Sequence, residues 1–153
     1  LFIGDSGKNS ETAILYEDFL RDYKGQATIT RDSVDLFMNT PELVVEREHT
    51  LLVVSFAQLQ KLFSKVYYPK MLTFSMQLQQ LVETLHKFTI TYPVTILTFH
   101  QGHIVIAAEG QVTTTPWVAP MAIWKGTVAT HAAAYWLWTP SKPLQAVTAS
   151  LVS

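Results

Sequence analysis

The chain has 153 residues, of which 48% are hydrophobic and 15% charged, and its formal net charge is −1. The length suits one globular domain, residues 1–153, and the apolar fraction excludes a disordered chain. No apolar run approaches the roughly 20 residues of a membrane-spanning helix, so no transmembrane segment is expected within these residues. The lack of cysteine excludes disulfides and thiolate chemistry.

The charges are unevenly distributed along the chain. After residue 50 the only acidic residues are Glu83 and Glu109, and no cluster of Lys and Arg occurs anywhere. Nucleic-acid binders carry such clusters, so no nucleic-acid partner is expected. The charge-poor second half has either a polar uncharged surface or a surface covered by a partner or by another copy of the chain.

The first predicted element is an amphipathic helix from about Glu11 to Lys24, capped by Ser10 and ended by Gly25. Its apolar residues fall on one face, which we expect to dock on an apolar surface. The residues of that face are Ala13, Tyr16, Leu20 and Tyr23, widened by Ile14, Leu15 and Phe19.

Short strands and two central helices are predicted next. The expected strands are 27–30 and 34–38, and 43–45 and 50–54 also have β-rich composition. Apolar spacing predicts helices over about 56–65 and 75–87.

The remainder predicts β-structure. Residues 94–100 and 103–108 alternate around Gln101-Gly102 as a hairpin, and turn signals separate further expected strands at 111–115, 119–124, 127–138 and 144–152. Short connections imply antiparallel pairing. The predicted fold is therefore α+β, with an antiparallel sheet of about five to seven strands in the C-terminal half, packed against the N-terminal helix and the two central helices. A doubly wound parallel fold is not expected.

The run Gly4-Asp5-Ser6-Gly7-Lys8 suggests two motifs and satisfies neither. It resembles the surroundings of the nucleophile in chymotrypsin-like proteases, but no histidine or aspartate lies upstream. A phosphate-binding loop needs glycine where Phe2 stands and Ser or Thr where Asn9 stands. We therefore interpret the run as a polar turn before the helix.

Two histidines are the candidate metal ligands. His100 and His103 flank the predicted hairpin turn, where opposed side chains stand about 5 Å apart at Cβ. Neutral imidazoles at that spacing can share zinc or copper, with Glu109 or His131 as a further ligand. Two ligands do not make a site, so exposed turn histidines are the favoured interpretation and no cofactor is predicted.

All the tryptophans lie in the second half, at Trp117, Trp124, Trp136 and Trp138. In a strand over 127–138, Trp136 and Trp138 share one face. That face belongs either to the core or to an exposed surface for a sugar, an apolar ligand or a protein.

No catalytic constellation can be assembled around the few carboxylates, so an enzyme is not favoured. We expect a non-catalytic interaction or assembly domain, part of a larger structural or envelope-associated complex, whose partners are other subunits or itself. The alternative is a domain that binds small molecules or carbohydrates through the tryptophans. The compartment is open; periplasmic, extracellular and particle settings all fit a soluble domain, and the start at Leu1 suggests a processed or excised form.

Overall fold

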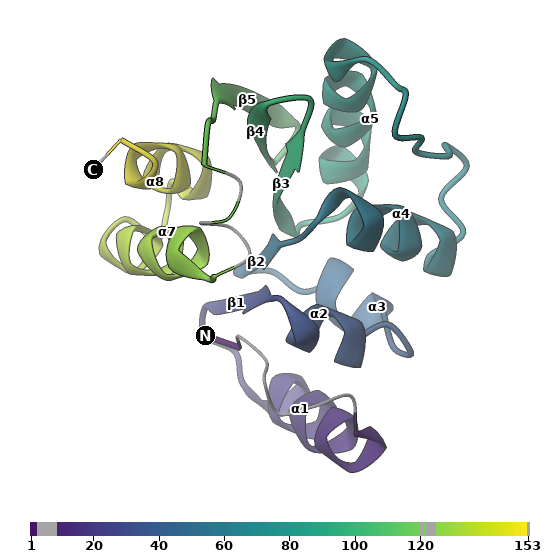
Figure 1. The fold of residues 1–153 in the computed structure, drawn as a ribbon. Coiled ribbons are helices and arrows are strands. Elements are labelled where there is room, and N and C mark those ends of the chain that lie inside the picture. Colours follow the sequence, from purple (N-terminus) through teal and green to yellow (C-terminus); the bar gives the residue numbers. More distant parts are fainter. Residues whose placement is uncertain (3–8, 120, 122–124, 153) are drawn as a thin grey trace.

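A computed structural model describes residues 1–2, 9–119, 121 and 125–152, which form an α+β fold (Figure 1). The strands are β1 (Ala27–Thr30), β2 (Thr50–Val53), β3 (Thr95–His100), β4 (His103–Ala108) and β5 (Gln111–Pro116). The helices of the first half are α1 (Ser10–Asp22), α2 (Asp32–Leu36), α3 (Glu42–Val45) and α4 (Phe56–Lys65). Those of the second half are α5 (Leu78–Thr91), α7 (Thr127–Trp138) and α8 (Pro143–Ser150).

The strands form one mixed sheet in the order β1-β2-β3-β4-β5. The pairs β1–β2 and β2–β3 are parallel, whereas β3–β4 and β4–β5 are antiparallel. Each parallel pair is joined through helices, because a parallel connection must return the chain from the end of one strand to the start of the next, at the opposite end of the sheet. The predicted hairpin is confirmed, with Gln101 and Gly102 in its turn and both at positive φ.

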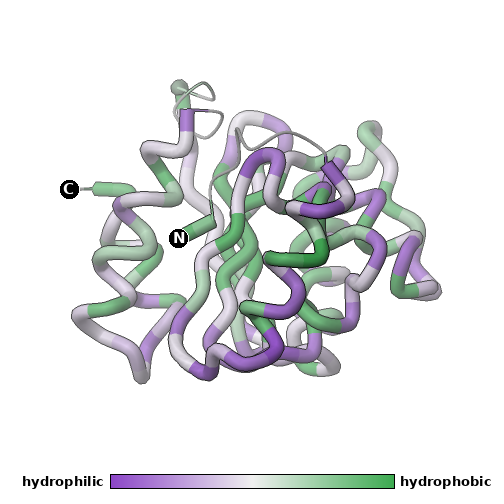
Figure 2. Tube along the Cα trace, turned by 90° about the horizontal axis from the view of Figure 1, so that it is seen from below, coloured by the Kyte–Doolittle hydropathy of each residue, from purple (hydrophilic) through white to green (hydrophobic). Residues whose placement is uncertain are grey.

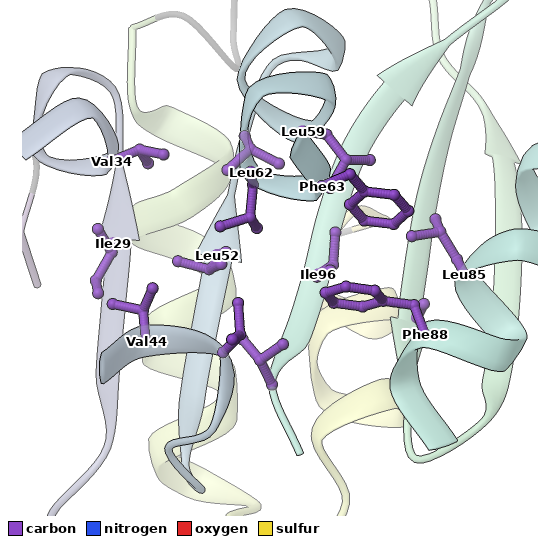
Figure 3. Packing of buried hydrophobic residues seen from close by; sticks show 14 of the residues in the cluster. Ile29, Val34, Val44, Leu52, Leu59, Leu62, Phe63, Leu85, Phe88 and Ile96 are labelled. Carbon is purple, nitrogen blue, oxygen red and sulfur yellow. The ribbon is translucent and has the colours of Figure 1, made fainter. Parts of the chain in front are cut away.

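Helices cover both faces of this sheet (Figure 1). One core cluster joins one face to the helices of the first half and α5 (Figure 3), and contains Ile29, Leu52, Leu62, Phe63, Phe88 and Ile96. The second cluster joins the opposite face to α7 and α8, and contains Leu51, Val53, Leu97, Ile106, Ala132 and Trp136. Hydrophobic segments therefore gather in the central strands (Figure 2).

The predicted antiparallel sheet is confirmed only in part, because β3, β4 and β5 pair antiparallel in the C-terminal half but belong to a mixed sheet. Two of the strands, β1 and β2, lie in the first half of the chain, and three neighbouring strands are parallel. The expected strands over 34–38 and 43–45 are the short helices α2 and α3. Valine, leucine and phenylalanine gave these segments a β-rich composition. In the structure the two helices pack their apolar side chains on one face of the sheet and add no strand to it.

The two last predicted strands are also wrong, because 127–138 and 144–152 lie mainly in helices α7 and α8. The two helices pack on each other and on one sheet face, so apolar residues surround much of α7. The expected strand 119–124 falls mostly outside the described residues. In the part of the chain that the structure describes, no helix is long and apolar enough to cross a membrane.

The cap of α1 is shifted by one residue from the prediction. Asn9, not Ser10, is the N-cap, and its Oδ1 accepts a hydrogen bond of 2.8 Å from the backbone N of Glu11. Asn9→Ala is therefore expected to lower the free energy of unfolding by about 1 kcal/mol, and Ser10→Ala by clearly less. Urea unfolding of the two variants measures the difference; equal losses would contradict the assigned cap.

Candidate interaction surface

The structure describes three of the four candidate tryptophans, Trp117, Trp136 and Trp138. Trp117 follows β5, and its backbone N donates to the carbonyl of Gly102 at the β3–β4 turn (2.9 Å). Trp136 lies near the end of α7, where its carbonyl accepts from Nε2 of Gln26, just before β1 (3.2 Å). The β3–β4 turn and the start of β1 lie at opposite ends of the strands, although Trp136 belongs to the second core cluster and the partly buried Trp117 packs against it.

The two tryptophans of α7 differ in exposure. Trp136 is buried, whereas Trp138 is 76% exposed and its ring centroid lies 5.4 Å from that of Tyr135. Helical geometry turns residues two apart by about 200°, which separates a pair that a strand would place on one face. Trp124 lies outside the described residues.

The two candidate metal ligands do stand opposite each other, since His100 pairs with His103 in the β3–β4 register. His100 is buried against Phe56, with ring centroids 4.3 Å apart, and its Nε2 lies 2.7 Å from the carbonyl of Met76. The Nδ1 atom of His103 lies 2.9 Å from the carbonyl of Gln101. Both rings thus use one nitrogen on a backbone carbonyl, and no group of three or more metal-ligating side chains occurs among the described residues.

An apolar strip on α1 is the clearest exposed feature of the described surface. Leu15, Phe19 and Tyr23 follow one another at intervals of four residues, and they are 67%, 51% and 40% exposed. Residues four apart lie one above another on a helix, so the three side chains make a continuous strip. We call these three residues the α1 strip.

The strip is exposed because the apolar face of α1 is wider than the protein surface on which the helix docks. Ala13 and Leu20 are buried against the first core cluster and its surroundings, and Tyr16 packs on it while partly buried. The strip continues this face around the helix, away from the neighbouring α2 and α3. The sequence pattern predicted an amphipathic helix that docks on an apolar surface. The fold covers only part of its apolar face, and the α1 strip is the part that stays exposed.

A groove runs between α1 and the start of the chain. Phe2 lies beside β1, its backbone N donating to Thr28 (2.7 Å) and its carbonyl accepting from Thr30 (2.9 Å), as an isolated parallel bridge. The groove measures about 550 Å³ and is lined by Leu1, Phe2, Leu15, Tyr16, Phe19, Tyr23 and Gln26. We call it the α1 groove.

Aromatic contacts shape the floor of the groove. The ring of Phe2 meets those of Tyr16 and Phe19 edge to face, with centroids 5.1 and 5.8 Å apart. Phe19 in turn stacks on Tyr23 at 5.3 Å. Such contacts fix ring positions, so the groove presents a preformed apolar surface at the β1 end of the sheet.

A contiguous apolar surface of this kind differs from the single exposed apolar residues that most proteins carry. Isolated exposed residues need no explanation, whereas apolar residues gathered along one groove give a surface whose role can be tested. Among the described lining residues no acidic, histidine or lysine side chain occurs.

In comparisons with known proteins, the chain matches no family model, no curated protein and no solved structure.

Proposed function

We propose that this chain is a non-catalytic protein–protein interaction domain and that the α1 groove holds an apolar segment of its partner. The observation that carries this proposal is the convergence of the exposed α1 strip on a groove already walled by Phe2 and Tyr16. Buried aromatic anchors in a preformed pocket contribute most of the free energy at protein interfaces.

The position of the groove supports a macromolecular partner. The groove lies beside β1, which is the edge strand of the sheet opposite to β5. There Phe2 forms an isolated parallel bridge with Ile29 of β1. Its walls come from a helix and an extended segment, and it opens to solvent along the α1 strip. A long, open, apolar groove on a helix suits the side chains of a docked polypeptide.

Position-specific photo-crosslinking tests the proposal. A photoreactive phenylalanine analogue replaces Leu15, and the protein is irradiated in the cells that naturally produce it. We expect one discrete adduct, which disappears when Phe19→Asp is added, because a carboxylate in the groove must lose its water on binding. Circular dichroism checks that Phe19→Asp stays folded, as its half-exposed side chain predicts.

The matched control places the same analogue at Ile90, which is 64% exposed on α5, remote from α1 in the fold. The control should give no adduct of that mass. Equal labelling from Ile90, or an adduct that survives Phe19→Asp, would overturn the proposal.

Ligand binding through exposed aromatic rings is the second candidate function, favoured by the adjacent rings of Tyr135 and Trp138. Exposed rings of this kind stack on sugars. Titration with a glycan panel should change the tryptophan fluorescence, and Trp138→Phe should remove that change. A flat response across the panel would dismiss this candidate.

A further inference from the structure

An acidic border accompanies the α1 strip. Glu11, Asp18 and Asp22 are exposed, and their spacings of seven and four residues place them on one line along α1. At about 100° per residue, this line lies directly beside Leu15, on the side away from the core. We call these three carboxylates the acidic border.

The border is open to a new partner. Arg21 Nη1 lies 3.2 Å from Asp18 Oδ1, but both side chains are more than half exposed. An exposed pair three residues apart on a helix contributes little and exchanges readily with another cation. The other nearby cation, Lys24, donates from its Nζ to the carbonyl of Arg21 (2.8 Å) and not to a carboxylate of the border.

We infer that the partner segment at the α1 groove is a basic amphipathic helix, with apolar side chains on the α1 strip and Lys or Arg against the acidic border. This inference rests on the proposed function. The strip from Leu15 to Tyr23 spans nine residues, whose eight steps give about 12 Å, the length of about two helical turns. A helix offers apolar residues at the matching spacing of four, with charges on its flank.

Charge also argues against a second copy of this chain as the occupant. If two copies of α1 packed antiparallel about a two-fold axis, the acidic border of one would lie beside the acidic border of the other. Like charges in such a position weaken association, whereas a basic flank strengthens it.

Two synthetic peptides of 18 residues test the inference with the whole chain. They share Leu at the apolar positions and Ala elsewhere, and they differ only in carrying Lys or Glu along the flank. We expect the Lys peptide to bind at least about fivefold more tightly than the Glu peptide at low salt. The preference should fall in 1 M NaCl, where the Debye length is only about 3 Å.

Charge variants locate the effect. The triple variant Glu11→Gln, Asp18→Asn, Asp22→Asn should abolish the preference for the Lys peptide and leave binding of the Glu peptide unchanged or stronger. The matched control Glu42→Gln, Glu46→Gln, Glu48→Gln removes three exposed carboxylates from the α3 region and should keep the preference. Calorimetry or fluorescence anisotropy gives the dissociation constants.

The outcomes separate the inference from the proposed function. Equal binding of both peptides that is lost in Phe19→Asp would overturn the basic partner and keep the groove as an interaction site. Binding of neither peptide, or binding that ignores Phe19→Asp, would overturn both. Concentration-dependent dimerisation through the groove, or binding of anionic phosphatidylglycerol vesicles that is lost in Phe19→Asp, would also overturn the inferred partner.

Discussion

Trp136→Ala is expected to lower the free energy of unfolding by about 3–5 kcal/mol, whereas Trp138→Ala changes it by less than about 0.5 kcal/mol. Trp136 is only 2% exposed and belongs to the core cluster between α7 and the sheet. Its Nε1 also donates to the carbonyl of Pro140 (3.3 Å). Alanine would leave a large cavity there, while at position 138 it removes a side chain that already faces water.

The pair is a matched test of the α7 layer, because the two residues are two positions apart. In a strand both rings would occupy one face and their replacement would have similar costs. In the helix one ring is buried and the other exposed, so the costs differ. Urea unfolding followed by far-ultraviolet circular dichroism gives both values without depending on tryptophan emission. Similar losses would contradict the helical assignment.

The same segment shows why part of the fold could not be predicted. Thr127–Trp138 is rich in alanine, threonine and tryptophan, and none of the charged types Asp, Glu, Lys and Arg occurs in it. Apolar residues such as Leu137 and Trp138 also occupy exposed positions of this helix, so it lacks a charged face and the 3.6-residue period that identifies a helix disappears. Local β propensity then suggested a strand, and packing between α8 and the sheet decided otherwise.

Segments with strong local signals were predicted well. Helix α4 lies where apolar spacing placed it, because Ser55 and Gln58 form a capping box at its start and the buried Phe56, Leu59 and Phe63 repeat at helical intervals. The hairpin of β3 and β4 follows from strict alternation around a glycine turn. The parallel pairing of β1 with β2 carries no such signal, since strand direction depends on the long connections between strands.

Part of the candidate interaction surface could be predicted from the sequence. The apolar width of α1, with Leu15 and Phe19 beside the face that Leu20 centres, is a property of the helix alone. How much of that width the domain covers depends on where α2 and α3 stand, and those two helices were interpreted as strands. The tryptophans were candidate contact residues because all of them lie in the second half of the sequence, yet the side chain of Trp136 is buried beneath α7 and has a structural role.

Arg47→Ala is expected to lower the free energy of unfolding by about 1.5–3 kcal/mol, since charged hydrogen bonds to three oxygen atoms are lost. The Nη2 atom of Arg47 donates to the carbonyls of Tyr23 (2.6 Å) and Gly25 (2.7 Å). Its Nη1 atom donates to Oγ1 of Thr50 (2.9 Å). One guanidinium therefore ties the end of α1 and the approach to β1 to the start of β2.

We call these hydrogen bonds of the Arg47 guanidinium the clamp. Burial lowers the pKa of Arg47, yet a guanidinium remains protonated at neutral pH, so the clamp keeps its charge. Arg47→Lys should recover less than half of the loss, because one ammonium group cannot reproduce a planar fork of donors. The matched control is Arg21→Ala, which removes an exposed arginine paired with Asp18 and should cost less than about 1 kcal/mol. Equal losses at the two arginines in urea unfolding would contradict the clamp.

The clamp also links stability to the α1 groove. Arg47 Cζ stands 5.6 Å from the ring centroid of Tyr23, the last residue of the α1 strip, and holds that residue's carbonyl. Without the guanidinium the end of α1 loses its attachment to the sheet, and the groove loses a fixed wall. Arg47→Lys should therefore weaken binding of the basic peptide in proportion to the freedom of Tyr23, which the NMR order parameter of that residue measures. Unchanged affinity beside a mobile Tyr23 would show that the partner binds along Leu15 and Phe19 alone.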